Sequence, residues 1–534
     1  MMTQQGAVFG ASILETLTTG MYKDPIIIYR EYIQNACDAI DQAVREGLYA
    51  EQRQGSVHLF IDRDKRYLSI EDNGAGVPVA KFRSTVGDIA NSAKEVGKDK
   101  GFRGIGRLAG LAYCKRLVFT TRAAGESVVS RLECDAVRFC AMVNEKGHTA
   151  AEVLDAAFFF SAEDAKKKDA AHFFRVELYD VEREADALLD KERIRGYLSF
   201  VAPAAYQSSF YQRKSITDYA AQHQAPLDEY RIIVNQEPLF KAYRTNYHYK
   251  DGKPDSIQDL AFKELKSADG TVLAWLWYAR TGFYGALAGK DRALAGIRVR
   301  VGNIQVGDED TLRSFYPEAR FAGYVMGELH VLPLAGLRPN ARRDYFNSSA
   351  QLTQLEEAFR SVAKEIGKLC HLGSDLNTQL KSIQKHEQAE QDFKQKSEEN
   401  RFLDAAARQK AADSLKSSGQ AAKIAEQKLK SIAEMGKQED VSDIDAGLAR
   451  IAAARLTVLK EERNRQPKPP ASKEKTLRPK KIPSDKARRT DNLSALSKKE
   501  KKMVHKIYCA VEKVLADDEE TRERVIAAIE EVLR

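Results

Sequence analysis

A carboxylate and an amide fall on one face of an expected helix near the N-terminus. Residues 26–44 place apolar side chains at three- and four-residue steps, which predicts an amphipathic helix. Glu31, Asn35 and Asp38 stand at positions i, i+4 and i+7, so they project from the same face. Because that face also carries small and apolar residues, the polar groups are partly buried and need partners. The pattern fits either a ligand-binding face or a solvated helix face.

A second group lies where a strand is expected to end. Residues 70–77 read Ile-Glu-Asp-Asn-Gly-Ala-Gly-Val. Gly74 and Gly76 permit a tight turn and a close approach of the backbone to a ligand. Asp72 can accept a hydrogen bond from an amino group such as that of adenine. Taken alone, an ordinary Asp-Asn-Gly turn is the simpler interpretation.

Three glycines, Gly101, Gly104 and Gly106, precede an apolar helical stretch. Glycines placed before a helix expose backbone N–H groups to a phosphate chain at the positive end of that helix. The segment is not a Rossmann fingerprint, since no short buried strand precedes it, and it lacks the Lys of a Walker A loop. By themselves, these glycines indicate phosphate binding only weakly.

In this order and spacing, the three segments resemble the N, G1 and G2 boxes of the GHKL ATPase superfamily, which includes gyrase, the 90-kDa heat-shock chaperones, histidine kinases and MutL. The resemblance covers residues 10–130. It implies a two-layer (Bergerat) domain with helices on a mixed sheet, in which ATP lies between the helices and a mobile lid. Histidine kinases are the poorer match, because they place the ATP domain last and lack a Glu at the first position of the N box.

The resemblance implies a role for each matching residue. Glu31 would be the general base that orients and deprotonates the attacking water, Asn35 the ligand of Mg²⁺, and Asp72 the residue that reads adenine. The remaining nucleotide contacts would come from both glycine segments and from a lid at about residues 88–100, namely Gly74, Gly76, Asn91, Ser92, Lys94, Gly101, Gly104, Ile105 and Gly106. The implied cofactors are ATP and Mg²⁺, and the implied reaction is hydrolysis of ATP to ADP and phosphate.

A fourth segment, residues 337–344, resembles a loop in the middle domain of the 90-kDa chaperones, whose Arg reaches the γ-phosphate of ATP. In that loop an Asn is followed three residues later by an Arg and then by an acid, which matches Asn340, Arg343 and Asp344. A rigid, always-charged guanidinium suits the charge on a transferring phosphoryl group. The neighbouring Arg342 stays an alternative, and so does a basic turn at the surface.

The elements that must position these residues alternate between helical and strand patterns. Segments 56–61 and 67–70 alternate apolar and polar residues around a turn and predict a hairpin, and 116–121 predicts another strand. Helices combined with a largely antiparallel sheet indicate an α+β fold. We therefore expect the GHKL ATP-binding domain at residues 1–185.

The rest of the chain divides by composition. A second, transducer-like α/β domain is expected at residues 186–368. Its strands would be 230–234, 272–278, 296–301 and 323–331. Ala, Lys, Glu, Gln, Leu and Ser then predominate without Pro, which predicts long helices or a coiled coil at 369–465. A basic, Pro-rich linker at 466–492 and a C-terminal helical pair at 493–534 complete the prediction.

Positive charge is concentrated in the linker. The net charge of the chain is +8, and residues 466–490 hold nine basic and two acidic side chains. Such a segment can bind the phosphate backbone of a nucleic acid without sequence preference, but a solvated linker has the same composition. The charge therefore leaves nucleic-acid binding open.

These features predict a chaperone-like or MORC-like GHKL ATPase that dimerises or closes as a clamp on ATP, to hold or remodel a protein or nucleic-acid partner. The expected partners are a second copy of the chain, a protein client, and nucleic acid at residues 466–490. Two alternatives stay open: a DNA-associated clamp similar to MutL or gyrase, and a nucleotide-gated interaction protein with little turnover.

The sequence also bears on the compartment. No stretch approaches the roughly 18 apolar residues that span a bilayer, and the N-terminus lacks the basic region of a signal peptide. The six cysteines form no C-x-x-C pair, so a zinc site or a disulfide framework is not expected. We expect a cytoplasmic protein without membrane contact.

Overall fold

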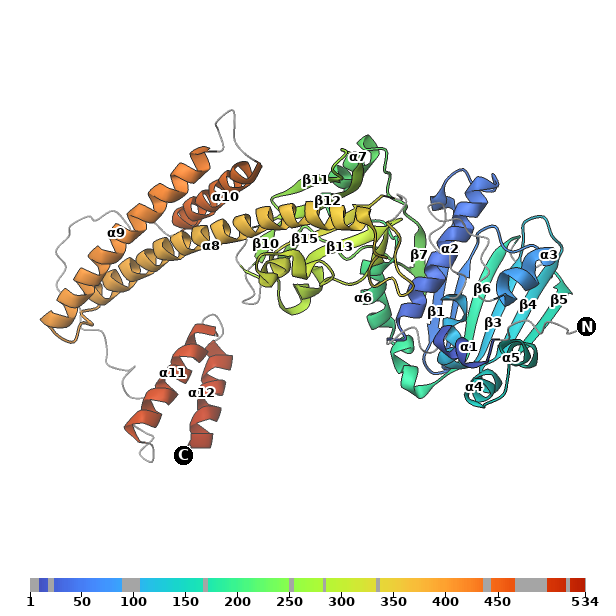
Figure 1. The fold of residues 1–534 in the computed structure, drawn as a ribbon. Coiled ribbons are helices and arrows are strands. Elements are labelled where there is room, and N and C mark those ends of the chain that lie inside the picture. Colours follow the sequence, from blue (N-terminus) through green and yellow to red (C-terminus); the bar gives the residue numbers. More distant parts are fainter. Residues whose placement is uncertain are drawn as a thin grey trace, which may run out of the picture. The chain divides into compact units, whose positions relative to one another are not determined.

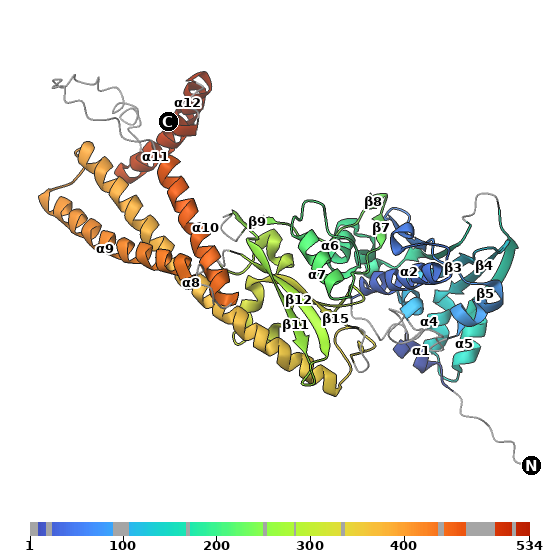
Figure 2. The same ribbon diagram turned by 90° about the horizontal axis from the view of Figure 1, so that it is seen from above.

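A computed structural model gives the fold of the chain (Figure 1 and Figure 2). It describes residues 9–17, 24–88, 106–166, 171–248, 254–281, 285–332, 337–435, 443–465, 497–514 and 519–533. The chain divides into two compact units, Met1–Arg463 and Asn464–Arg534. The described part of the first unit contains two large sheets and a set of long helices, and that of the second contains a helical pair.

A mixed sheet of eight strands, in the order β5-β4-β3-β6-β2-β1-β7-β8, supports the N-terminal part of the first unit. Its neighbours are antiparallel except for the parallel pair β1 and β7. The strands are β1 (Ser56–Asp62), β2 (Tyr67–Asp72), β3 (Cys114–Arg122), β4 (Val128–Asp135), β5 (Phe158–Asp164), β6 (Phe173–Val181), β7 (Arg231–Val234) and β8 (Glu237–Pro238). The predicted α+β fold, the hairpin of β1 and β2 and the strand at 116–121 are confirmed.

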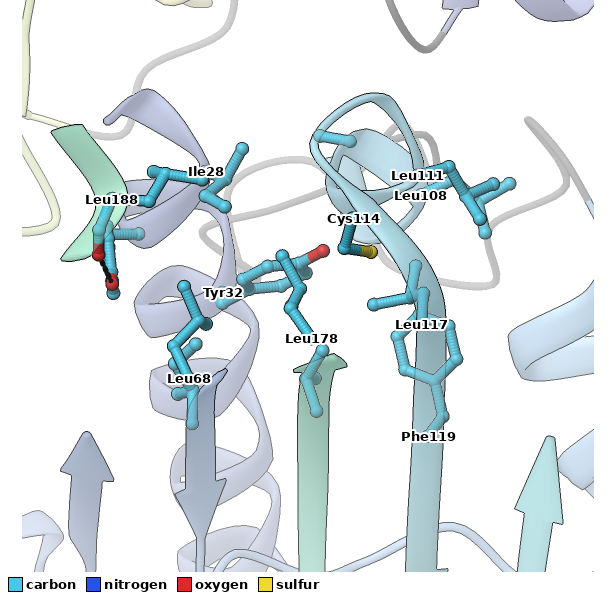
Figure 3. Packing of buried hydrophobic residues seen from close by; sticks show 14 of the residues in the cluster. Ile28, Tyr32, Leu68, Leu108, Leu111, Cys114, Leu117, Phe119, Leu178 and Leu188 are labelled. Atoms are coloured by element: carbon cyan, nitrogen blue, oxygen red, sulfur yellow. Dashed lines mark hydrogen bonds between the residues drawn. The ribbon is translucent and has the colours of Figure 1, made fainter. Parts of the chain in front are cut away.

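Helices cover one face of this sheet. They are α1 (Ser12–Leu17), α2 (Ile27–Arg45), α3 (Val79–Phe82), α4 (Ala136–Asn144) and α5 (Ala150–Ala157). Farther along the chain, α6 (Lys191–Val201) packs into the same core, whereas α7 (Arg213–Gln222) packs in a separate core with Trp275 and Trp277. Alternate strand residues such as Leu68, Leu117 and Leu178 point toward Ile28 and Tyr32 of α2 (Figure 3). The period of two in the strands and of 3.6 in the helix thus supplies the two apolar faces that form this core.

The strand predicted at 230–234 joins a different sheet from the one expected. The sequence pattern predicts it in the second α/β domain, but β7 pairs in parallel with β1 of the first sheet, with Ile232 opposite Val57. Ile232 and Val234 are buried in the first core. A short apolar strand pattern carries no information about its pairing partner, which is decided by where the intervening α6 and α7 return the chain. The predicted domain boundaries themselves stay a prediction.

The second sheet has the strand order β11-β12-β15-β13-β14, in which only β13 and β15 are parallel. Its strands are β11 (Asp259–Lys266), β12 (Val272–Arg280), β13 (Gly296–Val301), β14 (Ile304–Val306) and β15 (Met326–Val331), and β9 (Asn246–His248) and β10 (Pro254–Ser256) form a separate pair. The strands predicted at 272–278 and 296–301 are confirmed, and the one at 323–331 is shorter, because its first residues belong to a 3₁₀ helix, Ala319–Tyr324.

Long helices follow the second sheet. Helix α8 (Ala350–Glu398) packs on the sheet through Leu355, Phe359 and Val362, and α9 (Ala405–Met435) lies alongside its distal part in both views (Figure 1 and Figure 2). Helix α10 (Asp443–Arg465) follows α9 along the chain, and we call α8, α9 and α10 together the helical arm. The second unit contains α11 (Lys498–Val514) and α12 (Glu519–Leu533), while the whole predicted linker, 466–492, lies outside the described residues. None of the described helices is long and apolar enough to cross a membrane.

A fully buried network of charges ties the second sheet to the segment before it. Glu328 of β15 accepts hydrogen bonds from Arg300 Nε at 2.5 Å, from Lys241 Nζ at 2.9 Å and from the Tyr206 hydroxyl at 2.6 Å. Arg300 also donates to the carbonyl of Phe200 at the end of α6, at 2.6 Å. Since buried charges are tolerated only when paired and hydrogen-bonded, these contacts fix residues 200–241 against the sheet.

His330 makes the stability of this network depend on pH. Its Nε2 lies 3.1 Å from Glu328 Oε2, its ring stacks on Trp275, and burial lowers its pKa to about 4. An unfolded His titrates near 6.5, so the stabilisation is complete above about pH 6.5 and is lost as the pH falls toward 4. We expect the melting temperature to fall over this range and His330→Phe to flatten the fall. The exposed His58→Phe variant is the control, and equal profiles for both variants would contradict this role.

Candidate functional site

Helix α2 extends from one predicted glycine segment to the other. Near its start, a Cβ on Gly106 would lie 2.6 Å from Glu31 Oε2, and farther along, a Cβ on Gly74 would lie 2.5 Å from the carbonyl carbon of Ala39. Glu31 and Ala39 are about 12 Å apart along a helix that rises 1.5 Å per residue, and Asn35 lies midway. One helix face therefore meets both glycine segments, with a carboxylate at one end.

Tyr32 fixes the second glycine segment on α2 (Figure 3). Its hydroxyl donates to the carbonyl of Arg107 and accepts from the N–H of Gly110, both at 3.1 Å. The 3₁₀ helix Gly106–Ala112 also places Leu108 and Leu111 in the core, each about 1% exposed. Because these contacts are made by residues next to Gly106, they hold its backbone beside Glu31.

Asp72 ends β2 at the other end of the site. It is 3% exposed, and its Oδ1 accepts from the N–H of Gly74 at 2.9 Å. Gly76 has a φ of 70°, and a Cβ there would lie 2.1 Å from the carbonyl oxygen of Arg122 at the end of β3. This turn is therefore wedged between α2 and β3, and its two glycines are required by space as well as by backbone conformation.

Gly76 and Gly125 provide a matched test of this packing. Both have left-handed φ angles, 70° and 79°, but Gly125 has nothing within 4 Å of its would-be Cβ. An alanine at Gly125 should cost only the left-handed backbone penalty of about 1–2 kcal/mol. Gly76→Ala should additionally displace Asp72 and weaken nucleotide binding by about tenfold or more, measured by calorimetry with ADP. Equal losses in the two variants would exclude the steric explanation.

Arg30 is a site residue that the sequence analysis missed. It is 6% exposed, and its Nη2 lies 3.3 Å from Glu31 Oε1 and donates to the carbonyl of Arg342 at 2.8 Å. A charge-assisted hydrogen bond of this kind holds a carboxylate as an acceptor. An Arg next to a Glu in a helix gives no sequence signal, because its burial depends on a loop 312 residues away.

The predicted arginine segment contacts the same end of α2. We call residues 337–347 the arginine loop; at its tip Arg342 is exposed, while Arg343 is buried and has a left-handed φ of 53°. Asn340 donates to the Asp344 carboxylate and accepts from the backbone N–H of Asp344, which stabilises the turn. The contact of Arg342 with Arg30 thus brings the loop to the Glu31 end of the site.

Six predicted residues lie outside the described part of the chain: Asn91, Ser92, Lys94, Gly101, Gly104 and Ile105. Next to Gly106 in the sequence, Arg107 donates through Nε to the carbonyl of Val86 at 3.1 Å and through Nη2 to that of Asp88. Burial lowers the pKa of Arg107 to about 10, and the Asp88 carboxylate opposes this shift, so Arg107 stays a cation at neutral pH. It places positive charge next to Gly106 and was not predicted.

Comparison with known proteins identifies the N-terminal segment. Residues 27–154 match the model of the histidine kinase-, DNA gyrase B- and HSP90-like ATPase family. This segment is a GHKL ATPase domain. It contains Glu31, Asn35, Asp72 and both glycine segments, whereas Arg343 lies beyond it.

Several curated relatives of this chain carry the name chaperone protein HtpG. That of Acinetobacter baylyi is 29% identical over 132 residues, which is 22% of this chain and 21% of the relative. That of Polaromonas naphthalenivorans is 31% identical over 132 residues, again 22% and 21%, and that of Nocardia farcinica is 28% identical over 143 residues, 23% and 22%. The chain thus spans about a fifth of the length of these relatives.

Proposed function

We propose that the GHKL domain binds ATP with Mg²⁺ along α2 and hydrolyses it. The observation that carries this proposal is the face of α2 that meets the Asp72–Gly76 turn at Ala39 and the Gly106 segment at Glu31. A nucleotide lying along this face would have its base at the turn and its phosphates at the glycines. The carboxylate of Glu31 would then stand at the phosphate end, where a hydrolytic water must be activated.

The residues present fit both groups. A carboxyl oxygen of Asp72 would accept a hydrogen bond from the amino group of adenine, and the space left by Gly74 and Gly76 allows the backbone to approach the base. The predicted glycines would supply N–H donors to the phosphates. Asn35 would hold Mg²⁺ through its amide oxygen, and the bound ion would supply neutralisation of phosphate charge.

The reaction needs a base and a positive charge. Glu31 accepts a proton from water as the water oxygen forms a bond to the γ-phosphorus, and the bond from that phosphorus to the leaving oxygen breaks with its electron pair on ADP. Arg30 keeps the Glu31 carboxylate oriented through the contact at 3.3 Å. Arg343, from the arginine loop, would stabilise the charge on the transferring phosphoryl group.

Arg342 and Arg343 allow the arginine assignment to be tested within one loop. Arg343→Ala is expected to lower kcat for ATP hydrolysis by about 100-fold or more, since a guanidinium at this position is worth several kcal/mol in related reactions. Arg342→Ala should change kcat less than threefold, because its backbone, which the substitution retains, makes the contact with Arg30. Steady-state kinetics measure both. The opposite ranking would assign the role to Arg342.

We further propose that ATP drives dimerisation or clamp closure, with which the chain holds or remodels a protein or nucleic-acid partner. The support is the similarity to proteins named chaperone protein HtpG and the basic segment 466–490. Light scattering of Glu31→Ala with and without ATP tests the dimer, and an unchanged mass and hydrodynamic radius would reject this clamp model. DNA retention that is salt-sensitive and lost on deleting 466–490 would favour the DNA-associated clamp.

A further inference from the structure

The arginine loop and helix α8 are joined by a hydrogen bond between Tyr345 and Glu356. The Tyr345 hydroxyl donates to Glu356 Oε1 at 2.8 Å, across the beginning of the helix. Helix α8 starts only a few residues after Tyr345, where the Ser349 side chain accepts from the N–H of Leu352 at 3.1 Å. The loop is therefore attached to the helix both by the chain and by a side-chain contact.

The side of the loop near the second sheet is fixed. The N–H of Asn340 donates to the carbonyl of Tyr345, and the N–H of Gly307, after β14, donates to the carbonyl of Arg343, both at 2.8 Å. Phe346 is 7% exposed and belongs to the core that contains the first turns of α8. Tyr345 thus lies between the loop tip and this core, and its hydroxyl contacts the helix.

The opposite side of the loop contacts the ATPase domain. Arg30, which holds Glu31, donates to the carbonyl of Arg342 at the loop tip. A continuous set of contacts therefore leads from the catalytic carboxylate through Arg30 and the loop to Tyr345 and Glu356 of α8. Because the tip of the loop contacts Arg30 and its base contacts the second sheet and α8, a change in the position of the loop would be felt at both ends of this set of contacts.

We propose that Tyr345 is a positioning residue that couples the arginine loop to α8 through Glu356, so that the nucleotide state at Glu31 sets the position of the helical arm. This inference rests on the ATP site proposed above. Helix α8 has 49 residues, which corresponds to about 74 Å at 1.5 Å per residue, so a small rotation at its base becomes a large displacement at its far end. Burial and the bond to Glu356 raise the pKa of Tyr345, which keeps the phenol a donor at neutral pH.

Kinetics distinguish this coupling from a purely structural hydrogen bond. Tyr345→Phe should lower kcat about 5- to 10-fold and change KM less than twofold, since it displaces Arg343 without touching the nucleotide. Glu356→Leu should reproduce this loss, whereas Glu356→Gln, whose amide oxygen still accepts, should restore most of it. The double variant Tyr345→Phe, Glu356→Leu should be no slower than either single variant.

A matched control lies in the same core. Tyr324 packs edge-on against Phe321 there, so Tyr324→Phe removes a hydroxyl without affecting the loop. We expect Tyr324→Phe to leave kcat unchanged and to have the same melting temperature as Tyr345→Phe. An equal loss in the control, a multiplicative loss in the double variant, or a Glu356→Gln variant as slow as Glu356→Leu would overturn the coupling.

A distance measurement tests the coupling without turnover. Spin labels are attached at the exposed positions Asp64→Cys and Glu390→Cys, with Cys140 and Cys509 replaced by serine. We expect a non-hydrolysable ATP analogue to change the distance between the two labels in the otherwise unaltered protein. The same analogue should leave this distance unchanged when Tyr345→Phe is added. If the unaltered protein turns over ATP and both proteins respond equally, the coupling alone is wrong. If the unaltered protein neither hydrolyses ATP nor binds the analogue, the proposed function fails and the coupling fails with it.

Discussion

Glu31→Ala is expected to lower kcat for ATP hydrolysis by about 10²- to 10⁴-fold, the range that general-base catalysis contributes, while nucleotide affinity changes only a few-fold. Glu31 lies on α2 beside Gly106, whose missing side chain leaves room for its carboxylate. Its side chain is only 11% exposed, and Arg30 is its ion-pair partner. Because the base acts on water and not on the nucleotide, binding and turnover should separate.

Two further variants test whether turnover depends on the ability of Glu31 to take up a proton and on the orientation of its carboxylate. Glu31→Gln keeps the size of the side chain but cannot take up a proton, so it should be as slow as Glu31→Ala. Arg30→Ala should retain a weakened reaction, since the carboxylate remains but loses its orienting partner. Phosphate release measures turnover, and binding of a fluorescent ATP analogue measures affinity. Turnover that persists in Glu31→Gln would identify another base, and absent turnover in the unaltered protein would favour a nucleotide-gated interaction protein.

Local sequence pattern predicted the elements around the proposed nucleotide site, but not the contacts that complete it. The helix expected at 26–44 is α2 (Ile27–Arg45), and the hairpin appears as β1 and β2. These elements were predictable because their apolar periodicity is local. The burial of Arg30 depends on the arginine loop, and the placement of β7 depends on the path of α6 and α7, so both are properties of the tertiary fold.

The glycines of the site also show what the sequence can predict and what only the structure can explain. The type and spacing of Gly74, Gly76 and Gly106 indicated a nucleotide site through family resemblance. Only the structure shows the reason at each position: Gly74 meets the backbone of Ala39, Gly76 meets that of Arg122, and Gly106 meets Glu31. The predicted roles of these residues stay predictions until nucleotide binding is measured.

The buried network around Glu328 should produce the largest effect on stability. Burial alone would raise the pKa of Glu328, but Arg300 and Lys241 outweigh it and hold the pKa well below its usual range. The carboxylate is therefore ionised, and it accepts hydrogen bonds from two fully buried basic groups. Burial lowers the pKa of Lys241 to about 7, so Arg300 is the cation that depends on Glu328 most. Glu328→Ala leaves both basic groups without a counter-charge, which we expect to lower the free energy of unfolding by about 3–5 kcal/mol.

Urea denaturation followed by tryptophan fluorescence can measure this loss, because Trp275 and Trp277 lie in the neighbouring strand β12. The control is Glu318→Ala, whose partly exposed side chain pairs with Arg320 at the surface and should change stability by less than about 1 kcal/mol. Replacing Glu328, Arg300 and Lys241 together by methionine removes every charge of the network and should recover much of the stability. A triple variant as unstable as Glu328→Ala would show that lost packing, and not unpaired charge, is the cause.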